Sequence, residues 1–304
     1  MSVRQRGVAI VLAMGVVALA AIAAVAIVTS QSTWSRQSEL SGDRVQAQAV
    51  LQAGADWARA ILSDDLRAGS VDHLGEPWAL KLPPMQVENG ELVGQIEDRQ
   101  GAFNLNNLVT EGKISVAHLA QYKRLLAILG LPGELADTLA DWIDADGEPQ
   151  PRHGAEDAYY LSLEKPYLTA NRPLTDLSEL ALVRGYDEAV RARLRPYVAA
   201  LPRVTTVNVN TASPEVLAAV IDGLDLGSAR VLAAQRERAY FRSVDDFVKR
   251  LPYGAEAASG GLSVNTNYFL ATLRVTIGGA QARGSALLAR SSAGWPAVAW
   301  RKNQ

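Results

Sequence analysis

The sequence predicts an α+β fold in which a long N-terminal helix leads into an antiparallel sheet that is interrupted by an inserted all-α domain. Three observations predict it. An apolar run at residues 8–28 continues as helix to residue 66, alternating strands lie at both ends of the remaining chain, and a mostly helical block separates them. We therefore divide the chain into a leader (1–7), a long helix (8–66), a sheet-bearing core (67–108 and 262–304) and an inserted helical domain (109–261).

The N-terminal helix is long enough to cross a membrane and to continue beyond it. Its 21 residues at 8–28 are almost all apolar and would cover about 30 Å, one bilayer core. No Ala-x-Ala-like cleavage box follows, as it would after a removable signal peptide. Beyond the span, apolar residues recur with helical spacing at Ala47, Leu51, Gly54, Ala58 and Ile61. The span is expected to cross a membrane once, with Arg4 and Arg6 keeping the N-terminus cytoplasmic and sending the rest of the chain outward.

Composition excludes several classes of function. The net charge is −2, which argues against a nucleic-acid binder. Cysteine is absent, so the chain has no disulfide, iron–sulfur cluster or thiol nucleophile. The three histidines (His73, His118 and His153) leave little scope for a histidine-rich metal site.

The sheet is predicted from a hairpin and from the C-terminal strands. In "MQVENGELVGQIEDRQG", Asn89-Gly90 would supply the positive φ angles of a tight primed turn between two strands. The segments "SVNTNYFLATLRVTIGGAQARGSALLARSS" and "WPAVAWRKN" alternate as strands.

The helical block contains a degenerate repeat that resembles a helix-hairpin-helix module. "FNLNNL" at 103–108 is echoed by "VNVNTA" at 207–212, and a short helix capped by Thr175 or Ser243 ends each copy. In DNA-binding copies the hairpin amides cradle a phosphate. Here Asp222 and Asp225 flank the second hairpin and would repel a phosphate, leaving Arg230 as the main cation, so a compact packing unit is favoured over DNA binding.

One acidic segment, "DWIDADGEPQPRHGAEDAYY", carries the candidate metal ligands. Crowded carboxylates repel unless a cation neutralises them, and an oxygen-only set suits Ca²⁺, which accepts 6–8 oxygens. One alternative is a solvated acidic loop paired with Arg152 and Arg172. Another, a metallo-hydrolase, would require an open coordination position and a base, and no HExxH-like motif is present. The candidate ligands are Asp141, Asp144, Asp146, Glu148, Glu156 and Asp157.

The N-terminus "RQRG" followed by "VAIVLAMGVV" resembles the leader of type IV pilins and pseudopilins. That resemblance implies that a prepilin peptidase cuts between Gly7 and Val8, that Val8 is then N-methylated, and that the helix is kept as the stalk of the subunit. Two positions depart from the family pattern: Val8 stands where most members have Phe, and Leu12 where most have Glu. A plain signal-anchor helix is the alternative.

The leader, the helical insertion, "DWIDADGEP…GAEDAYY" and "VNVNTAS" together resemble the type II secretion system protein K family of minor pseudopilins. The resemblance implies a pseudopilin core, calcium in the inserted domain, no enzymatic activity, and a tip complex with the minor pseudopilins I and J. In that family the tip primes a pseudopilus that exports folded proteins across the outer membrane. The alternatives are a membrane-tethered helix-hairpin-helix receptor for DNA uptake and a minor pilin of a type IV pilus.

Overall fold

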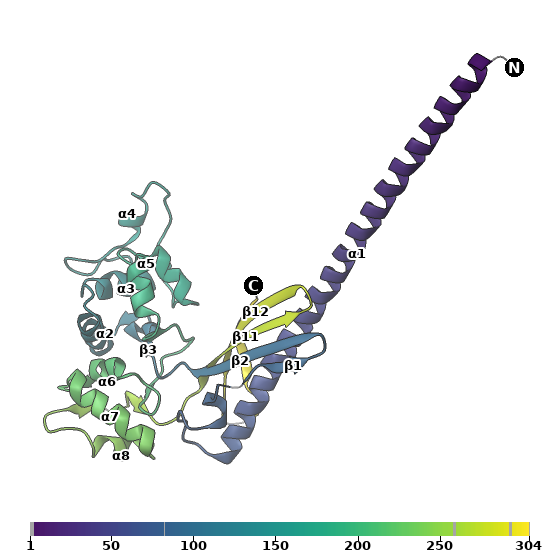
Figure 1. Ribbon diagram of the computed structural model, residues 1–304. Coiled ribbons are helices and arrows are strands. Elements are labelled where there is room, and N and C mark those ends of the chain that lie inside the picture. Colours follow the sequence, from purple (N-terminus) through teal and green to yellow (C-terminus); the bar gives the residue numbers. More distant parts are fainter. Residues whose placement is uncertain (1–2, 82, 258–259, 292–293, 304) are drawn as a thin grey trace.

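A computed structural model describes residues 3–81, 83–257, 260–291 and 294–303, and its longest element is the N-terminal helix α1 (Val3–Ala68) (Figure 1). As predicted, the helix is continuous from the apolar run into the folded domain. By length and composition alone, α1 is the one described helix that could cross a membrane. Its N-terminal part projects away from the domain, so apolar side chains such as Ile10 and Val28 are exposed.

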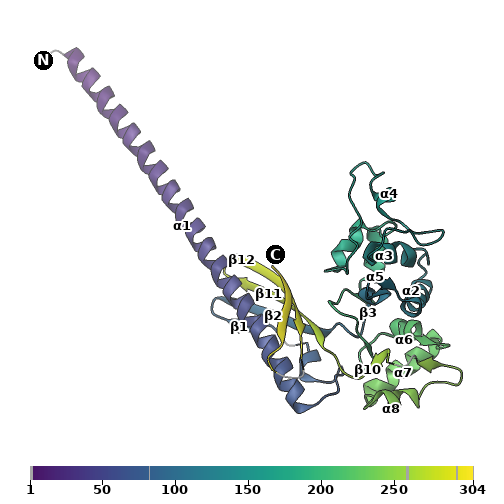
Figure 2. The ribbon, with the colours of Figure 1, turned by 180° about the vertical axis from the view of Figure 1, so that it is seen from behind.

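The second half of α1 packs on one face of a five-stranded antiparallel sheet, in the order β1-β2-β11-β12-β13 (Figure 2). Ala47 and Leu51 of α1 contact the buried side chains of Leu273 and Val275. The predicted apolar stripe therefore faces the sheet, and the alternate residues of the strands face away from α1. The strands are β1 (Met85–Val87), β2 (Gly90–Asp98), β11 (Tyr268–Ile277), β12 (Ala280–Ala289) and β13 (Ala297–Asn303).

The β1–β2 hairpin is present, but its turn lies one residue earlier than predicted. Val87 pairs with Gly90, so Glu88 and Asn89 form the loop, and of the predicted pair only Asn89 has a positive φ, 60°. Gly90 is required for a different reason. A Cβ at that position would lie 1.9 Å from the carbonyl oxygen of Thr276 on β11.

The insertion runs from the end of β2 to the start of β11 and holds the largest apolar core among the described residues. It is mostly helical but contains short paired strands, so it is not all-α. Residues 103–108, which the sequence analysis assigned to the sheet-bearing core, belong to the insertion. Its helices are α2 (Val116–Ile128), α3 (Leu135–Ile143), α4 (Asp157–Tyr160), α5 (Glu188–Leu194), α6 (Pro214–Val220), α7 (Leu226–Arg238) and α8 (Val244–Val248), with 3-10 turns η2 (Leu105–Leu108) and η3 (Leu177–Leu182); a further turn, η1 (Pro77–Ala79), lies at the base of α1.

The predicted repeat appears as two units, each closed by a parallel strand pair. β3 pairs with β6 in the first unit, and β7 pairs with β10 in the second. The tight turns use Gly130 (φ 64°) and Gly223 (φ 70°). Ser243 caps α8 as predicted, whereas η3 is capped by Asp176 and not by Thr175. The short strands are β3 (Phe103–Asn104), β4 (Val109–Thr110), β5 (Lys113–Ile114), β6 (Val198–Ala199), β7 (Val207–Asn208), β8 (Ile221–Asp222), β9 (Glu256–Ala257) and β10 (Leu262–Ser263).

The Asp98 carboxylate, at the end of β2, ties the sheet to the insertion. It accepts hydrogen bonds from the backbone of Gln100 and Gly101 and from the side chains of Asn208 and Thr211. Because Asn208 begins the second repeat, this buried network fixes the insertion to the end of the sheet.

Candidate metal centre

Three of the six predicted ligands come together where α3 ends and α4 begins. All nine residues of α3 are buried, so Asp141 in its last turn is carried into the interior with the apolar side chains around it. Asp144 directly follows α3, and Glu156 directly precedes α4. One carboxylate oxygen from each of Asp141, Asp144 and Glu156 lies within 4.8 Å of the others. We call these three residues the acidic trio.

The acidic trio is buried, and only some of its carboxylate oxygens accept hydrogen bonds. Relative exposures are 0% for Asp141, 1% for Asp144 and 5% for Glu156. Asp141 accepts backbone hydrogen bonds from Gln150 (3.1 Å) and Ala155 (2.7 Å), which fold the intervening loop over it. Within the described part of the chain, Asp144 Oδ1 and both carboxylate oxygens of Glu156 are buried without a hydrogen-bond partner. Buried carboxylate oxygens without a donor are costly, so this arrangement fits a bound cation.

Burial and mutual repulsion shift the titration of the trio. Desolvation, followed by the charges of Asp146 and Asp141, raises the pKa of Asp144 to about 7. Desolvation, followed by the charge of Asp141, raises the pKa of Glu156 to about 7. Burial also raises the pKa of Asp141. The C-terminal end of α3 adds negative potential at the same place. Burial, mutual repulsion and the C-terminal end of α3 therefore favour a positive ion at the trio.

The other three predicted ligands lie outside the trio. Asp146 is exposed and accepts a hydrogen bond from the backbone of Glu148 (2.9 Å), but it is close enough to raise the pKa of Asp144. Glu148 is exposed. Asp157 accepts hydrogen bonds from the backbone and hydroxyl of Thr169, which lower its pKa and hold the segment after α4.

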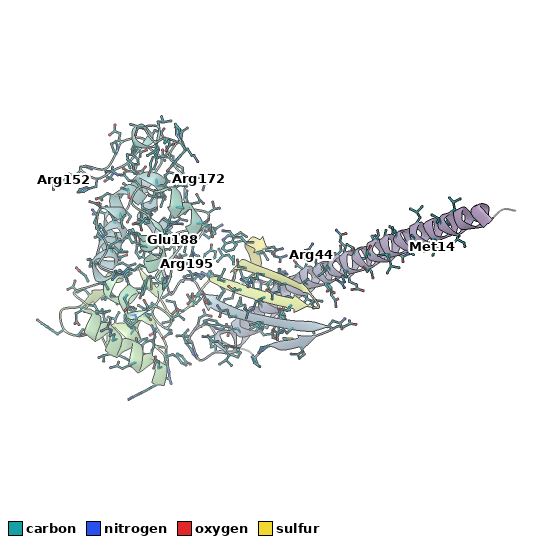
Figure 3. The ribbon with its side chains drawn as sticks, turned by 45° about the horizontal axis from the view of Figure 1, so that its top comes forward. Met14, Arg44, Arg152, Arg172, Glu188 and Arg195 are labelled. Atoms are coloured by element: carbon teal, nitrogen blue, oxygen red, sulfur yellow. The ribbon has the colours of Figure 1, made fainter. Side chains whose placement is uncertain are left out.

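The cations proposed for a solvated acidic loop do not pair with the trio. Arg172 bonds Glu179 at 3.0 Å, and Arg152 and Arg172 lie on opposite sides of the insertion in Figure 3. Among the described residues, no ion pair links the trio to a lysine, arginine or histidine. His153, which a metallo-hydrolase could have used, faces Glu134 at 3.6 Å.

A second carboxylate group, which the sequence does not predict, is partly compensated by one arginine of the chain. Asp65, Asp72 and Glu76 lie together at the base of α1. There Arg290 pairs with Asp65 at 2.8 Å and also with Asp72. Arg290 is 218 residues away from Asp72 in the chain, so the sequence spacing gives no signal for this cluster. In contrast to the acidic trio, these buried carboxylates are paired with an arginine of the same chain.

The hairpin of the second repeat places a carboxylate where a phosphate would bind. Asp225 caps α7 by accepting a hydrogen bond from the backbone of Ser228 (3.0 Å), so it occupies the helix N-terminus. Asp222 pairs with Arg124 at 3.4 Å. Arg230 remains exposed on α7.

The predicted processing site lies at the free end of α1. The backbone of Gly7 and Val8 is helical, and their side chains lie outside the described part of the structure. Leu12 is exposed on the projecting segment, with 64% of its surface accessible.

Comparison with known proteins places these features in a family. Residues 101–203 and 207–265 match two domains described as "Type II secretion system (T2SS), protein K". The type II secretion system protein K of Pseudomonas aeruginosa is 41% identical over 286 residues, covering 90% of this chain and 85% of that protein. The Klebsiella pneumoniae protein of the same name is 35% identical over 305 residues, covering 95% and 93%.

A solved structure matches both the core and the insertion. It is a chain of the GspK-GspI-GspJ complex from the enterotoxigenic Escherichia coli type 2 secretion system. The TM-score is 0.74 and the identity 28%, and the match covers 85% of this chain and 96% of that one. Together with the sequence relatives, this match shows that the chain belongs to the type II secretion system protein K family, the minor pseudopilins that the sequence resembled.

Proposed function

We propose that this protein is the tip subunit of a type II secretion pseudopilus, where it primes assembly together with the minor pseudopilins I and J. The assembly serves to export folded proteins across the outer membrane. The observation that carries the proposal is the similarity of nearly the whole chain, insertion included, to a chain solved in a GspK-GspI-GspJ complex. The sequence features of a stalk helix and a pilin-like sheet fit the same role.

The shape of the molecule favours an end position over a repeating one. The insertion lies beyond the sheet, on the side away from the projecting part of α1 (Figure 1). A shaft that repeated this unit would have to accommodate the insertion beside every subunit. At the tip there is no subunit ahead, so the bulk has free space.

Leu12 is also consistent with a place at the end of the pseudopilus. In the pilin family, Glu at the fifth mature position is thought to neutralise the amino terminus of the subunit ahead. An unpaired charge in hydrocarbon costs at least about 2.5–3.5 kcal/mol on insertion scales, so the Glu is useful only where that amine is present. A tip subunit has no such partner, and an apolar leucine is then the better residue.

Membrane insertion and processing complete the proposed pathway. Residues 8–28 would anchor the protein in the inner membrane with the domain in the periplasm, oriented by Arg4 and Arg6. A prepilin peptidase would remove residues 1–7, and Val8 would become the methylated N-terminus of the mature subunit.

The acidic trio is proposed to hold Ca²⁺. Its donors are all oxygens, and the chain has no cysteine, so the set suits a hard cation. Asp141, Asp144 and Glu156 would supply carboxylate oxygens, and Asp146 is the nearest further carboxylate by its electrostatic effect. A bound ion would neutralise the trio and tie the end of α3 to the start of α4.

Co-purification tests the proposed assembly directly. The full-length chain is expressed in membranes with the I and J pseudopilins of its own secretion system and extracted in mild detergent. We expect the three proteins to elute as one complex, whereas an unrelated single-pass protein of similar size does not join it. Elution of this chain apart from both I and J would overturn the proposal.

A further inference from the structure

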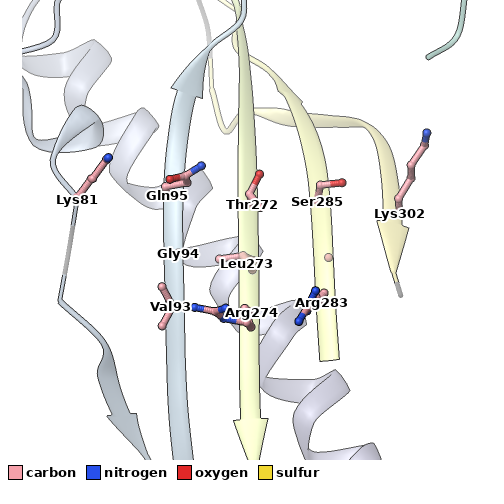
Figure 4. Close-up of a pocket in the computed structure, with 11 residues that line it drawn as sticks. Lys81, Val93, Gly94, Gln95, Thr272, Leu273, Arg274, Arg283, Ser285 and Lys302 are labelled. Atoms are coloured by element: carbon pink, nitrogen blue, oxygen red, sulfur yellow. The ribbon is translucent and has the colours of Figure 1, made fainter. Parts of the chain in front are cut away.

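The face of the sheet that α1 leaves uncovered carries a groove of about 500 Å³ (Figure 4). The strand register arranges its side chains in two rows. One row runs Gln95, Thr272, Ser285 and Lys302, and the other runs Val93, Arg274 and Arg283. Gly94 and Gly284 lie between the rows, where the strand residues face α1 on the other side of the sheet. The groove thus combines two guanidinium groups with an amide, two hydroxyls and the ammonium groups of Lys81 and Lys302.

Arg274 and Arg283 are directly opposite one another in the β11–β12 register, and both are exposed. Like charges directly opposite on one face of a sheet destabilise it. Within the described residues neither side chain has a hydrogen bond or an ion pair to a carboxylate, although Lys302 in the same groove pairs with Asp176 at 2.6 Å. The fold therefore leaves two adjacent positive charges uncompensated at the centre of an open sheet face.

We propose that this groove binds an acidic extended segment of a neighbouring pseudopilin, with a carboxylate side chain held between Arg274 and Arg283. Guanidinium groups bind carboxylates through paired, charge-assisted hydrogen bonds, and two of them side by side suit one carboxylate or two neighbouring ones. The hydroxyls of Thr272 and Ser285 can donate to the backbone carbonyls of the same segment. The inference rests on the proposed function because it needs a neighbouring subunit.

The position of the groove argues against an anionic lipid as the occupant. Gly284 lies against Leu51 of α1, which is 23 residues beyond Val28 at the end of the apolar span. Along a helix that separation is about 35 Å, several times the roughly 8 Å Debye length at physiological salt. Lipid headgroups would therefore be out of reach, whereas a subunit packed beside α1 would not.

A photo-cross-linker at Thr272 tests the inference in the full chain. Benzoylphenylalanine replaces Thr272, the protein is co-assembled with the I and J pseudopilins in membranes, and the cross-linked peptide is identified by mass spectrometry. We expect a peptide rich in Asp or Glu from one of these subunits. A cross-link to lipid or nucleic acid, or none in a complex that still co-purifies, overturns the inference while leaving the proposed function standing. Loss of co-purification in the parent chain instead overturns the proposed function.

Charge reversal separates binding from folding. Arg274→Glu makes an opposite-charge pair with Arg283, so the melting temperature should stay the same or rise, while the cross-link yield should fall at least ten-fold. Arg283→Glu makes the same pair in reverse and serves as the second variant. Arg230→Glu with Arg238→Glu, two exposed arginines of α7, is the control for added negative charge and should leave the cross-link unchanged.

A compensating charge reversal in the partner subunit completes the test. Replacing the cross-linked acidic residue of the partner by lysine should restore the cross-link in the Arg274→Glu chain. An unchanged cross-link yield in both single-reversal variants contradicts a role for the arginine pair.

Discussion

Asn106 and Asn210 hold distant backbone segments by the same pair of hydrogen bonds. The Asn106 amide donates to the carbonyl of Leu174 (2.9 Å) and accepts from its N–H (2.8 Å). The Asn210 amide does the same with Phe241, at 2.9 and 2.8 Å. Each asparagine therefore fastens the end of its repeat unit to the beginning, which explains why the second asparagine of the Asn-x-Asn pattern recurs in both units.

Asn210→Ala should destabilise the insertion strongly. The change leaves a buried N–H and a buried C=O of Phe241 without partners, each worth about 1–3 kcal/mol. We expect the free energy of unfolding to fall by about 2–5 kcal/mol, measured by urea denaturation of the detergent-solubilised chain. The exposed Asn265 supplies the matched control, and Asn265→Ala should change it by less than about 0.5 kcal/mol. Equal losses of stability from the two substitutions would contradict the proposed role of the Asn210 side chain in holding Phe241.

Calcium should stabilise the protein through the acidic trio. A ligand at 100 times its dissociation constant adds about 2.7 kcal/mol, which corresponds to several degrees in melting temperature. Asp144→Ala with Glu156→Ala should abolish the gain, whereas Glu148→Ala, outside the trio, should keep it. Melting in calcium and in chelator makes the comparison, with magnesium at equal concentration to establish selectivity. If calcium leaves the wild-type midpoint unchanged, the metal proposal is wrong.

Without metal, the protein should lose stability as the pH rises from 5 to 7.5. The folded pKa values of Asp144 and Glu156 are about 7, whereas in the unfolded chain both groups ionise near pH 4. In this interval the native state holds protons that the unfolded state has released, so the free energy of unfolding falls, by up to about 1.4 kcal/mol per pH unit and group. Saturating calcium should remove this loss, because the ion replaces the protons.

Chelated samples melted across this pH range check the prediction, and Asp144→Asn with Glu156→Gln is the control. That variant lacks the two trio carboxyls whose pKa is about 7, so its decline should be clearly smaller than that of the wild type. Asp72, whose pKa burial raises to about 6, still contributes to the decline at the lower end of the range. A metal-free wild type that is more stable at pH 7.5 than at pH 5 would contradict the picture of a repelling trio.

Processing should leave a mature chain that begins at Val8. Cleavage after Gly7 removes the leader at the cytoplasmic edge of the span, where Arg4 and Arg6 hold it, and N-methylation adds one methyl group. Intact-mass measurement of the membrane form decides between this and a plain anchor helix, with cells lacking the prepilin peptidase as the control. Retention of residues 1–7, or a cut beyond the apolar run, would exclude the predicted pathway.

The elements that follow a strong local pattern could be predicted from the sequence. The helix was visible in the apolar run and in the spacing of Ala47, Leu51 and Ala58, and the strands were visible in their alternation. The hairpin turn was misplaced by one residue because Gly90 was attributed to a turn angle. Its actual cause is the approach of Thr276, which lies 186 residues along the chain and leaves no local signal.

The sequence predicts six candidate ligands within one segment, and the fold brings three of them together. Composition locates the acidic loop. Only the fold shows that Asp144 and Glu156 lie close together, whereas Asp157 accepts hydrogen bonds from Thr169 instead. The groove and its Arg274–Arg283 pair depend on the register between two strands. A one-residue shift in that register would separate the arginines, so alternation alone could not reveal the pair.

The most direct test of the central claim is the position of this chain in assembled pseudopili. The protein carries a label at an exposed position of α7, such as Arg230, and fibres assembled with the full set of pseudopilins are imaged by electron microscopy with gold detection. The account predicts one label per fibre, at one end, with the label absent from fibres assembled without this chain. Labels spaced regularly along the shaft would contradict the tip assignment.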